Sequence, residues 1–123
     1  MAAPNVVSVA TITAKTFYAN VTTTDTVLLA NSASSGKVFK INTITIANVD
    51  GTNSADITVS INTNAAGSGT SYKLAHTIAV TADSSLVLVD KSSAFYLEED
   101  KSIKVLASAN SDLDVMISYE EIS

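Results

Sequence analysis

Residues 42–61 read NTITIANVDGTNSADITVSI, two runs of alternating apolar and polar residues on either side of the short polar segment DGTN. Apolar residues recur at every second position, which is the pattern of a strand with one face toward a core. Asp50-Gly51 is typical of a tight turn, because Asp accepts hydrogen bonds from nearby backbone amides and Gly tolerates positive φ. The stretch therefore predicts two strands joined by a turn.

The simplest arrangement of these two strands is an antiparallel hairpin. It would place Ile46 opposite Ile57 and Ile44 opposite Val59, and residues directly opposite each other share a face of the sheet. The large apolar side chains of both strands would then face one core, and the threonines between them would face solvent. A slip of one residue would mix the two sets, so the pattern predicts this register.

Further short runs of the same kind extend along the whole chain. They occupy residues 6–13, 26–30, 38–41, 72–80, 86–89, 103–107 and 113–119. The parity of the apolar positions changes between 39–41 and 44–46, which predicts a bulge or bend near Asn42-Thr43. The run LVLV at 86–89 reads as a strand buried on both faces, and AAGSGTS at 65–71 reads as a flexible loop.

The number and spacing of these strands predict the fold class. About eight or nine short strands without a helical stripe indicate an all-β protein, a single antiparallel β-sandwich of jelly-roll-like or Ig-like type. The 123 residues suit one domain, and no linker or charge run divides them. Residues 1–5 are expected to form an N-terminal arm that a partner holds in place.

Charge and composition exclude several classes of function. The net charge is −5 with seven lysines and no arginine, so binding to nucleic acid or to an anionic membrane is not expected. No run approaches the roughly 20 apolar residues that span a bilayer, and the N-terminus lacks the basic region of a signal peptide. The absence of cysteine excludes disulfides and thiolate metal sites.

The side chains that carry chemistry do not assemble into a catalytic set. His76 is the sole histidine, and a general base or a metal site needs partners. Glu98, Glu99 and Asp100 resemble a glycosidase pair, but neighbours on a strand point to opposite faces, so the cluster is expected to be a solvated hairpin turn. The sequence therefore predicts no enzyme.

Two loops resemble ligand-binding motifs only in part. Asn110, Asp112 and Asp114 match the opening of a calcium loop and Glu121 stands at its final Glu position, but Val115 stands where that loop needs Gly. A plain turn is favoured, and weak calcium binding stays open. Gly67-Ser68-Gly69 is too short for a phosphate loop, and Asn20-Val21-Thr22 is treated as a chance glycosylation sequon. No catalytic, cofactor-binding or metal-binding residue and no cofactor is predicted.

Four segments in a fixed order carry a resemblance over nearly the whole chain. They are the Thr-rich strand Thr22–Leu29, the run Gly36–Ile41, the N-x-D-G-T-N segment Asn48–Asn53 and the closing Ser118–Glu121 after an acidic turn. In this order they resemble small β-sandwich virion proteins of tailed bacteriophages, particularly marine and cyanobacterial phages. Glu99 departs from related turns, which have Gly before the final Asp.

The resemblance implies a structural role in a virion, after synthesis in the host cytoplasm. The first expectation is a non-enzymatic capsid decoration (cement) protein that bridges subunits of the major capsid protein, itself a small homo-oligomer. The alternatives are a tail, neck or fibre adaptor, and a carbohydrate-binding adhesin module. The adhesin would need exposed aromatic residues, for which Tyr18, Tyr72 and Tyr96 are the candidates.

Overall fold

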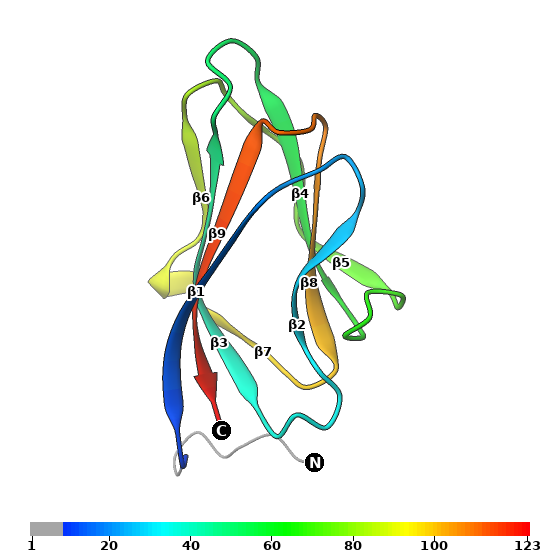
Figure 1. Ribbon diagram of the computed structural model, residues 1–123, viewed down its shortest axis with the longest axis vertical. Coiled ribbons are helices and arrows are strands. Elements are labelled where there is room, and N and C mark those ends of the chain that lie inside the picture. Colours follow the sequence, from blue (N-terminus) through cyan, green and yellow to red (C-terminus); the bar gives the residue numbers. More distant parts are fainter. Residues whose placement is uncertain (1–8) are drawn as a thin grey trace.

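The computed structural model describes residues 9–123 and shows two antiparallel sheets packed face to face (Figure 1). This confirms the expected all-β sandwich. The N-terminal arm predicted at residues 1–5, and the start of the strand predicted at 6–13, lie outside the described residues. The elements are β1 (Ile12–Asn20), β2 (Thr26–Asn31), β3 (Val38–Asn48), β4 (Ala55–Asn62), β5 (Ser71–Val80), β6 (Ser85–Val89), the 3-10 turn η1 (Lys91–Ser93), β7 (Phe95–Leu97), β8 (Lys101–Ala107) and β9 (Leu113–Ile122).

The order of the strands is that of a jelly roll. Sheet A has the order β1-β9-β3-β6, with β7 also paired to β3, and sheet B has the order β2-β8-β4-β5. The pairs β1·β9, β2·β8, β3·β6 and β4·β5 are those of one long antiparallel hairpin that has been rolled up, so that successive pairs alternate between the two sheets. The jelly-roll alternative therefore holds, and the Ig-like one does not.

The predicted hairpin about DGTN is wrong. β3 belongs to sheet A and β4 to sheet B, so the segment between them crosses from one sheet to the other. Ile46 pairs with Val115 and Leu86, and Ile57 pairs with Ala107 and Ile78. Both isoleucines still point into the core. The alternation is satisfied equally well by two strands that pair and by two strands that face each other across a core.

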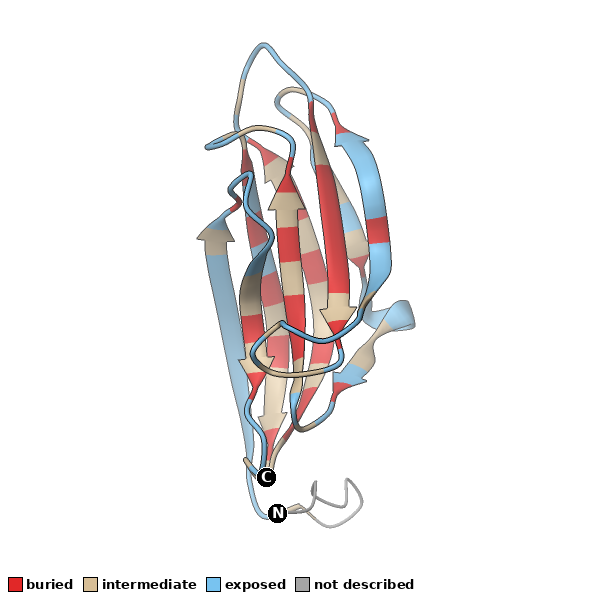
Figure 2. Cartoon of the chain, turned by 90° about the vertical axis from the view of Figure 1, so that its right-hand side faces the viewer, coloured by how far each residue is buried: buried red, intermediate tan, exposed pale blue. Residues whose placement is uncertain are grey.

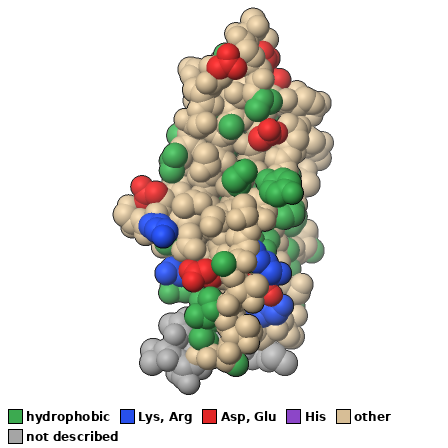
Figure 3. Space-filling model, turned by 60° about the vertical axis from the view of Figure 1, so that its left-hand side comes forward, with side chains coloured by type: hydrophobic (Ala, Val, Ile, Leu, Met, Phe, Trp, Pro, Cys, Tyr) green, Lys and Arg blue, Asp and Glu red, His purple; other side chains and the backbone are tan. Residues whose placement is uncertain are grey.

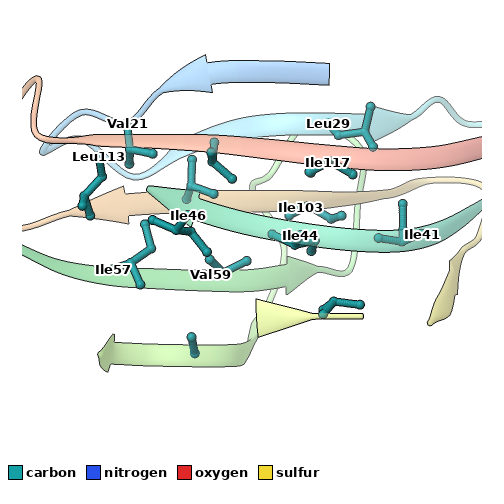
Figure 4. Packing of buried hydrophobic residues seen from close by; sticks show 14 of the residues in the cluster. Val21, Leu29, Ile41, Ile44, Ile46, Ile57, Val59, Ile103, Leu113 and Ile117 are labelled. Atoms are coloured by element: carbon teal, nitrogen blue, oxygen red, sulfur yellow. The ribbon is translucent and has the colours of Figure 1, made fainter. Parts of the chain in front are cut away.

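The core lies between the inner faces of the two sheets. Its fully buried side chains come from both sheets, including Ile41, Ile44, Ile46, Leu113 and Ile117 from sheet A and Ile57, Val59 and Ile103 from sheet B (Figure 4). Buried residues run along the middle strands, whereas β1 and β5 at the margins of the sandwich are mostly exposed (Figure 2).

Irregularities in the strands agree only partly with the sequence. The register of β3 on β9 shifts between Ile41 and Thr43, which confirms the bulge predicted there. The run at 86–89 is a strand, β6, but it forms a sheet edge and Val87 is exposed on it, so the prediction of burial on both faces is wrong.

Buried asparagines close three strands and organise the loops that follow them. β2 ends at Asn31, β3 at Asn48 and β4 at Asn62, and all three side chains are buried. Asn48 donates to the carbonyls of Asn53 and Val80 and accepts from the amide of Asp50, while Asp50 accepts from the amides of Thr52 and Asn53. These bonds hold the crossing at 49–54 against the ends of both sheets.

Candidate functional site

His76 lies exposed on β5, an edge strand of sheet B. Within residues 9–123, no group of three or more His, Asp or Glu side chains is placed to hold a metal ion. The residue thus lies away from any ligand set in the described part of the chain. The predicted absence of catalytic and metal-binding residues stays a prediction.

The acidic turn at Glu98, Glu99 and Asp100 is hydrogen-bonded to two other loops. It connects β7 in sheet A to β8 in sheet B and is not the hairpin turn that was expected. Glu99 accepts a hydrogen bond of 3.2 Å from the amide of Gly36, and Asp100, at φ 56°, accepts one of 3.0 Å from the amide of Ala65. Glu99 and Asp100 thus bind backbone amides of two other loops.

The loop Asn110–Asp114 is likewise occupied by internal hydrogen bonds. Asn110 accepts from the amide of Thr23 at 2.9 Å, and Asp114 accepts from the side-chain amide of Asn20 at 2.8 Å. The loop joins the end of β8 to the start of β9 and is held against the segment that follows β1. Two of its three candidate calcium ligands therefore already have partners, which supports the plain-turn interpretation.

The loop between β4 and β5 covers part of the outer face of sheet B, and a hollow of about 330 Å³ lies over another part, lined by residues that include Thr58 and Leu106. Lys104 on that face donates to the carbonyl of Gly67 at 3.0 Å and forms an ion pair with Asp25 at 3.0 Å. Ser60 and Ser102 point outward from sheet B, yet they are 1% and 0% exposed. Figure 2 shows a loop crossing in front of this sheet. The segment predicted as a flexible loop thus packs over part of this face.

The outer face of sheet A is open by contrast. Tyr18 of β1 lies beside Met116 of β9, Met116 beside Thr45 of β3, and Thr45 beside Val87 of β6. Tyr18, Met116 and Val87 are 70%, 52% and 60% exposed, and a hollow of about 440 Å³ is lined by Tyr18, Thr45 and Met116 but not by Val87. We call these four residues the apolar row. Figure 3 shows separate hydrophobic side chains spread over this side of the molecule, some of them in its middle.

Charged side chains gather toward one end of sheet A. Glu121 pairs with Lys15 at 3.1 Å and with Lys37, and Glu120 lies 4.0 Å from Lys40. The hydrogen bond from Lys37 lowers the pKa of Glu121, and the hydrogen bond from Lys15 lowers it further. Burial raises this pKa, but the two lysines outweigh the effect of burial. In Figure 3 the lysines lie in the lower half of the molecule. A charged region therefore lies next to the apolar row, toward one end of sheet A.

The sequence contained a signal for the apolar row that periodicity alone did not single out. Met116 lies between Asp114 and Ser118 on the outward positions of β9, where alternation places polar residues. A large apolar residue at a solvent position is informative when it recurs on neighbouring strands. Of the other two candidate tyrosines, Tyr72 lies on β5 in sheet B, whereas Tyr96 of β7 is exposed on the outer face of sheet A, opposite Lys40 of β3 and outside the apolar row.

Comparison with known proteins identifies relatives in fold only. No protein-family model and no curated protein matches the sequence. Among solved structures, the chain is similar to a protein of Bacillus endospore appendages, described as disulfide-linked pili, with a TM-score of 0.55, 14% identity, and 92% of this chain and 87% of the other covered. Because this chain has no cysteine, no disulfide links copies of it.

A second similar structure comes from the T13 particle of the virus IBDV. The TM-score is 0.51 at 8% identity, and the match covers 94% of this chain but 32% of the viral one. The chain thus corresponds to about a third of that protein. Both similar proteins belong to assembled particles or fibres, and at these identities the likeness concerns the fold. No helix among the described residues is long and apolar enough to cross a membrane.

Proposed function

We propose that the protein is a non-enzymatic structural subunit of a tailed-bacteriophage virion, and first of all a capsid decoration (cement) protein. The observation that carries the proposal is the contrast between the two outer faces. Part of the outer face of sheet B is covered by the chain's own loop, with Ser60 and Ser102 buried, whereas sheet A exposes the apolar row. An exposed apolar row on the less covered face is suited to attachment to a partner.

The resemblance of the sequence to phage virion proteins supports the same role. The two similar solved structures add that a jelly roll of this kind occurs in a pilus and in a viral particle. A cement protein needs no catalytic centre, and it acts by bridging neighbouring capsid subunits. Each bridge contributes little by itself, but many copies on one shell act together, so the shell gains stability by multivalency.

The test compares particles with and without the protein. Shells that lack it should release DNA at a lower temperature than complete shells, and added protein should restore the original release temperature. Added Met116→Asp protein should fail to restore it, because the charge lies in the middle of the apolar row. Tyr72→Asp, on β5 at the margin of sheet B, is the matched control and should restore it fully.

The alternative role is a tail, neck or fibre adaptor. If shells without the protein release DNA at the same temperature but fail to attach tails or to adsorb to cells, the cement role is wrong and the adaptor takes its place. Electron microscopy of the same particles separates these two defects, since tail-less heads and non-adsorbing complete particles differ in appearance.

A further inference from the structure

β1 is a long edge strand whose one usual protection is Lys15, which pairs with Glu121 of the neighbouring β9 at 3.1 Å. It runs for nine residues, Ile12–Asn20, and pairs with β9 in one continuous register. It contains neither Pro nor Gly, and every residue except the half-buried Ala19 is exposed. Among residues 9–123, only β9 pairs with it. Edge strands of this kind are templates for pairing with another chain.

The remaining edges of the two sheets are all blunted. β2 carries a register shift between Val27 and Leu29, and β5 carries two shifts where it pairs with β4. The far edge of sheet A consists of two short strands, β6 with five residues and β7 with three. Bulges and short strands are the means by which proteins prevent edge-to-edge association. The contrast singles out β1 as the edge that is left to pair.

The hydrogen-bonding direction of each residue in β1 follows from its pairing. Thr11 and Ser123 exchange both backbone hydrogen bonds, and the register continues without a shift to Val21 and Leu113. Because bonded pairs alternate along an antiparallel ladder, the odd residues of β1 bond to β9. The even residues turn their N–H and C=O groups to the open edge. They are Ile12, Ala14, Thr16, Tyr18 and Asn20.

We propose that two copies of this chain pair through β1, antiparallel about a two-fold axis at Thr16. Thr16 is the midpoint of the strand, so this register pairs all nine residues. It places Ala14 opposite Tyr18 of the second copy, and none of the outward-bonding positions is charged. Lys15 falls opposite Phe17, whereas a register centred on Lys15 would set two lysines against each other. The strand is thus self-complementary.

The pairing has a defined geometry and a defined limit. An axis perpendicular to the sheet joins the two copies of sheet A into one continuous sheet, with both apolar rows on the same side. The contact is isologous and closes on itself, and the blunted edges β2, β5, β6 and β7 stop further strand addition, so the assembly ends at the dimer. This proposal goes beyond the virion role and does not depend on it.

A single cysteine tests the register directly, because the chain has none of its own. In the proposed dimer, the Cα atoms of Thr16 and its copy lie about 5.5 Å apart, within the range of a disulfide. Thr16→Cys should therefore form a covalent dimer on mild oxidation. Ala14→Cys is the matched control, since its two copies lie roughly 14 Å apart along the strands and should stay uncrosslinked. Equal crosslinking of both variants would overturn the proposal.

The non-covalent dimer is tested by sedimentation velocity on the full chain over a range of concentrations. Thr16→Pro removes one outward N–H without removing a bond to β9, so it should weaken dimerisation at least tenfold while the circular dichroism spectrum stays that of the wild type. Thr16→Val keeps the N–H and should dimerise as the wild type does. A wild-type monomer at millimolar concentration, or dimers that Thr16→Pro leaves intact, would rule out pairing through β1. If deletion of residues 1–8 abolishes the dimer, the pairing edge belongs to that segment and not to β1.

Discussion

The side-chain amide of Asn48, at the end of β3 in sheet A, donates a 2.8 Å hydrogen bond to the carbonyl of Val80, at the end of β5 in sheet B. The same side chain accepts from the amide of Asp50, so one buried residue joins the two sheets and shapes the crossing between β3 and β4. The role of Asn31 at the end of β2 is similar, with bonds to the carbonyls of Lys37 and Leu97.

Asn48→Ala should lower the free energy of unfolding by about 1–3 kcal/mol, because it leaves buried backbone groups without partners. Urea denaturation measures the change. Asn110→Ala is the control, since Asn110 is exposed and also bonds to a loop amide. Equal losses in the two variants would show that burial of the amide of Asn48 contributes nothing.

Replacing Ile46 or Ile57 by Ala should each cost about 2–5 kcal/mol of stability, because both side chains are fully buried in the core that the two sheets share. Replacement by Asp should cost more, since it buries an unpaired charge. Val87→Ala, on the exposed face of β6, should change stability by less than about 0.5 kcal/mol. Thermal unfolding of the five variants would contradict this core if Val87→Ala were as damaging as the isoleucine changes.

Met116→Asp should leave the fold unchanged and abolish attachment to a partner. The side chain is half exposed and lies in the apolar row, so the new carboxylate stays in water in the free protein but is buried in a complex. The unfolding midpoint should shift by no more than a few degrees, while binding to shells, measured by co-sedimentation, should be lost. A variant that still binds would place the attachment surface elsewhere.

Stability should fall on acidification in part through Glu121. Its pKa lies below the ordinary value of 4.5 because Lys37 and Lys15 donate hydrogen bonds to it, so the folded state favours the ionised form. The stabilisation is present above the unfolded pKa near 4.5 and is lost as the pH falls through the lower, folded value. Glu121→Gln should lose stability at neutral pH and depend less on pH below 5. Glu98→Gln, at an exposed position, should follow the wild-type pH profile.

Metal ions should have little effect on this protein. Elemental analysis of protein purified without added metal should find no stoichiometric zinc or iron. Calcium should shift the melting temperature by no more than a few degrees, because Asn110 and Asp114 already bond to Thr23 and Asn20. A larger shift would mean that calcium binds the folded state, and would assign the loop Asn110–Asp114 as its site.

Much of the fold could be predicted from particular residues. The alternation in residues 42–61 predicted that Ile44, Ile46, Ile57 and Val59 are buried, and the parity change before Ile44 predicted the bulge in β3. Its expectation that Thr58 faces solvent is wrong, because Thr58 is buried on the outer side of β4, as is Ser60. The pairing of the strands could not be predicted in the same way. Alternation reports which face of a strand meets the core, and it does not report which strand lies beside it.

The candidate site was less accessible to the sequence than the core. The apolar row has one residue on each of four strands, and β1 and β6 lie at opposite margins of sheet A. No window of the sequence contains it, so only the strand order brings Tyr18 and Val87 onto one face. The absence of cysteine and the single histidine, by contrast, were visible at once and already argued against common catalytic centres.

The sequence by itself determined that this protein is a β-sandwich with Ile44, Ile46, Ile57 and Val59 in its core. Local alternation and turn residues suffice for this, because burial acts on each strand separately. The tertiary structure alone decided that β3 and β4 lie in opposite sheets, that a loop covers part of one outer face, and that β1 is a long edge strand without a bulge. These features depend on contacts between residues far apart in the chain, such as Tyr18 with Met116. The free energy of these contacts depends on how all the strands are arranged, and a local sequence pattern does not specify that arrangement.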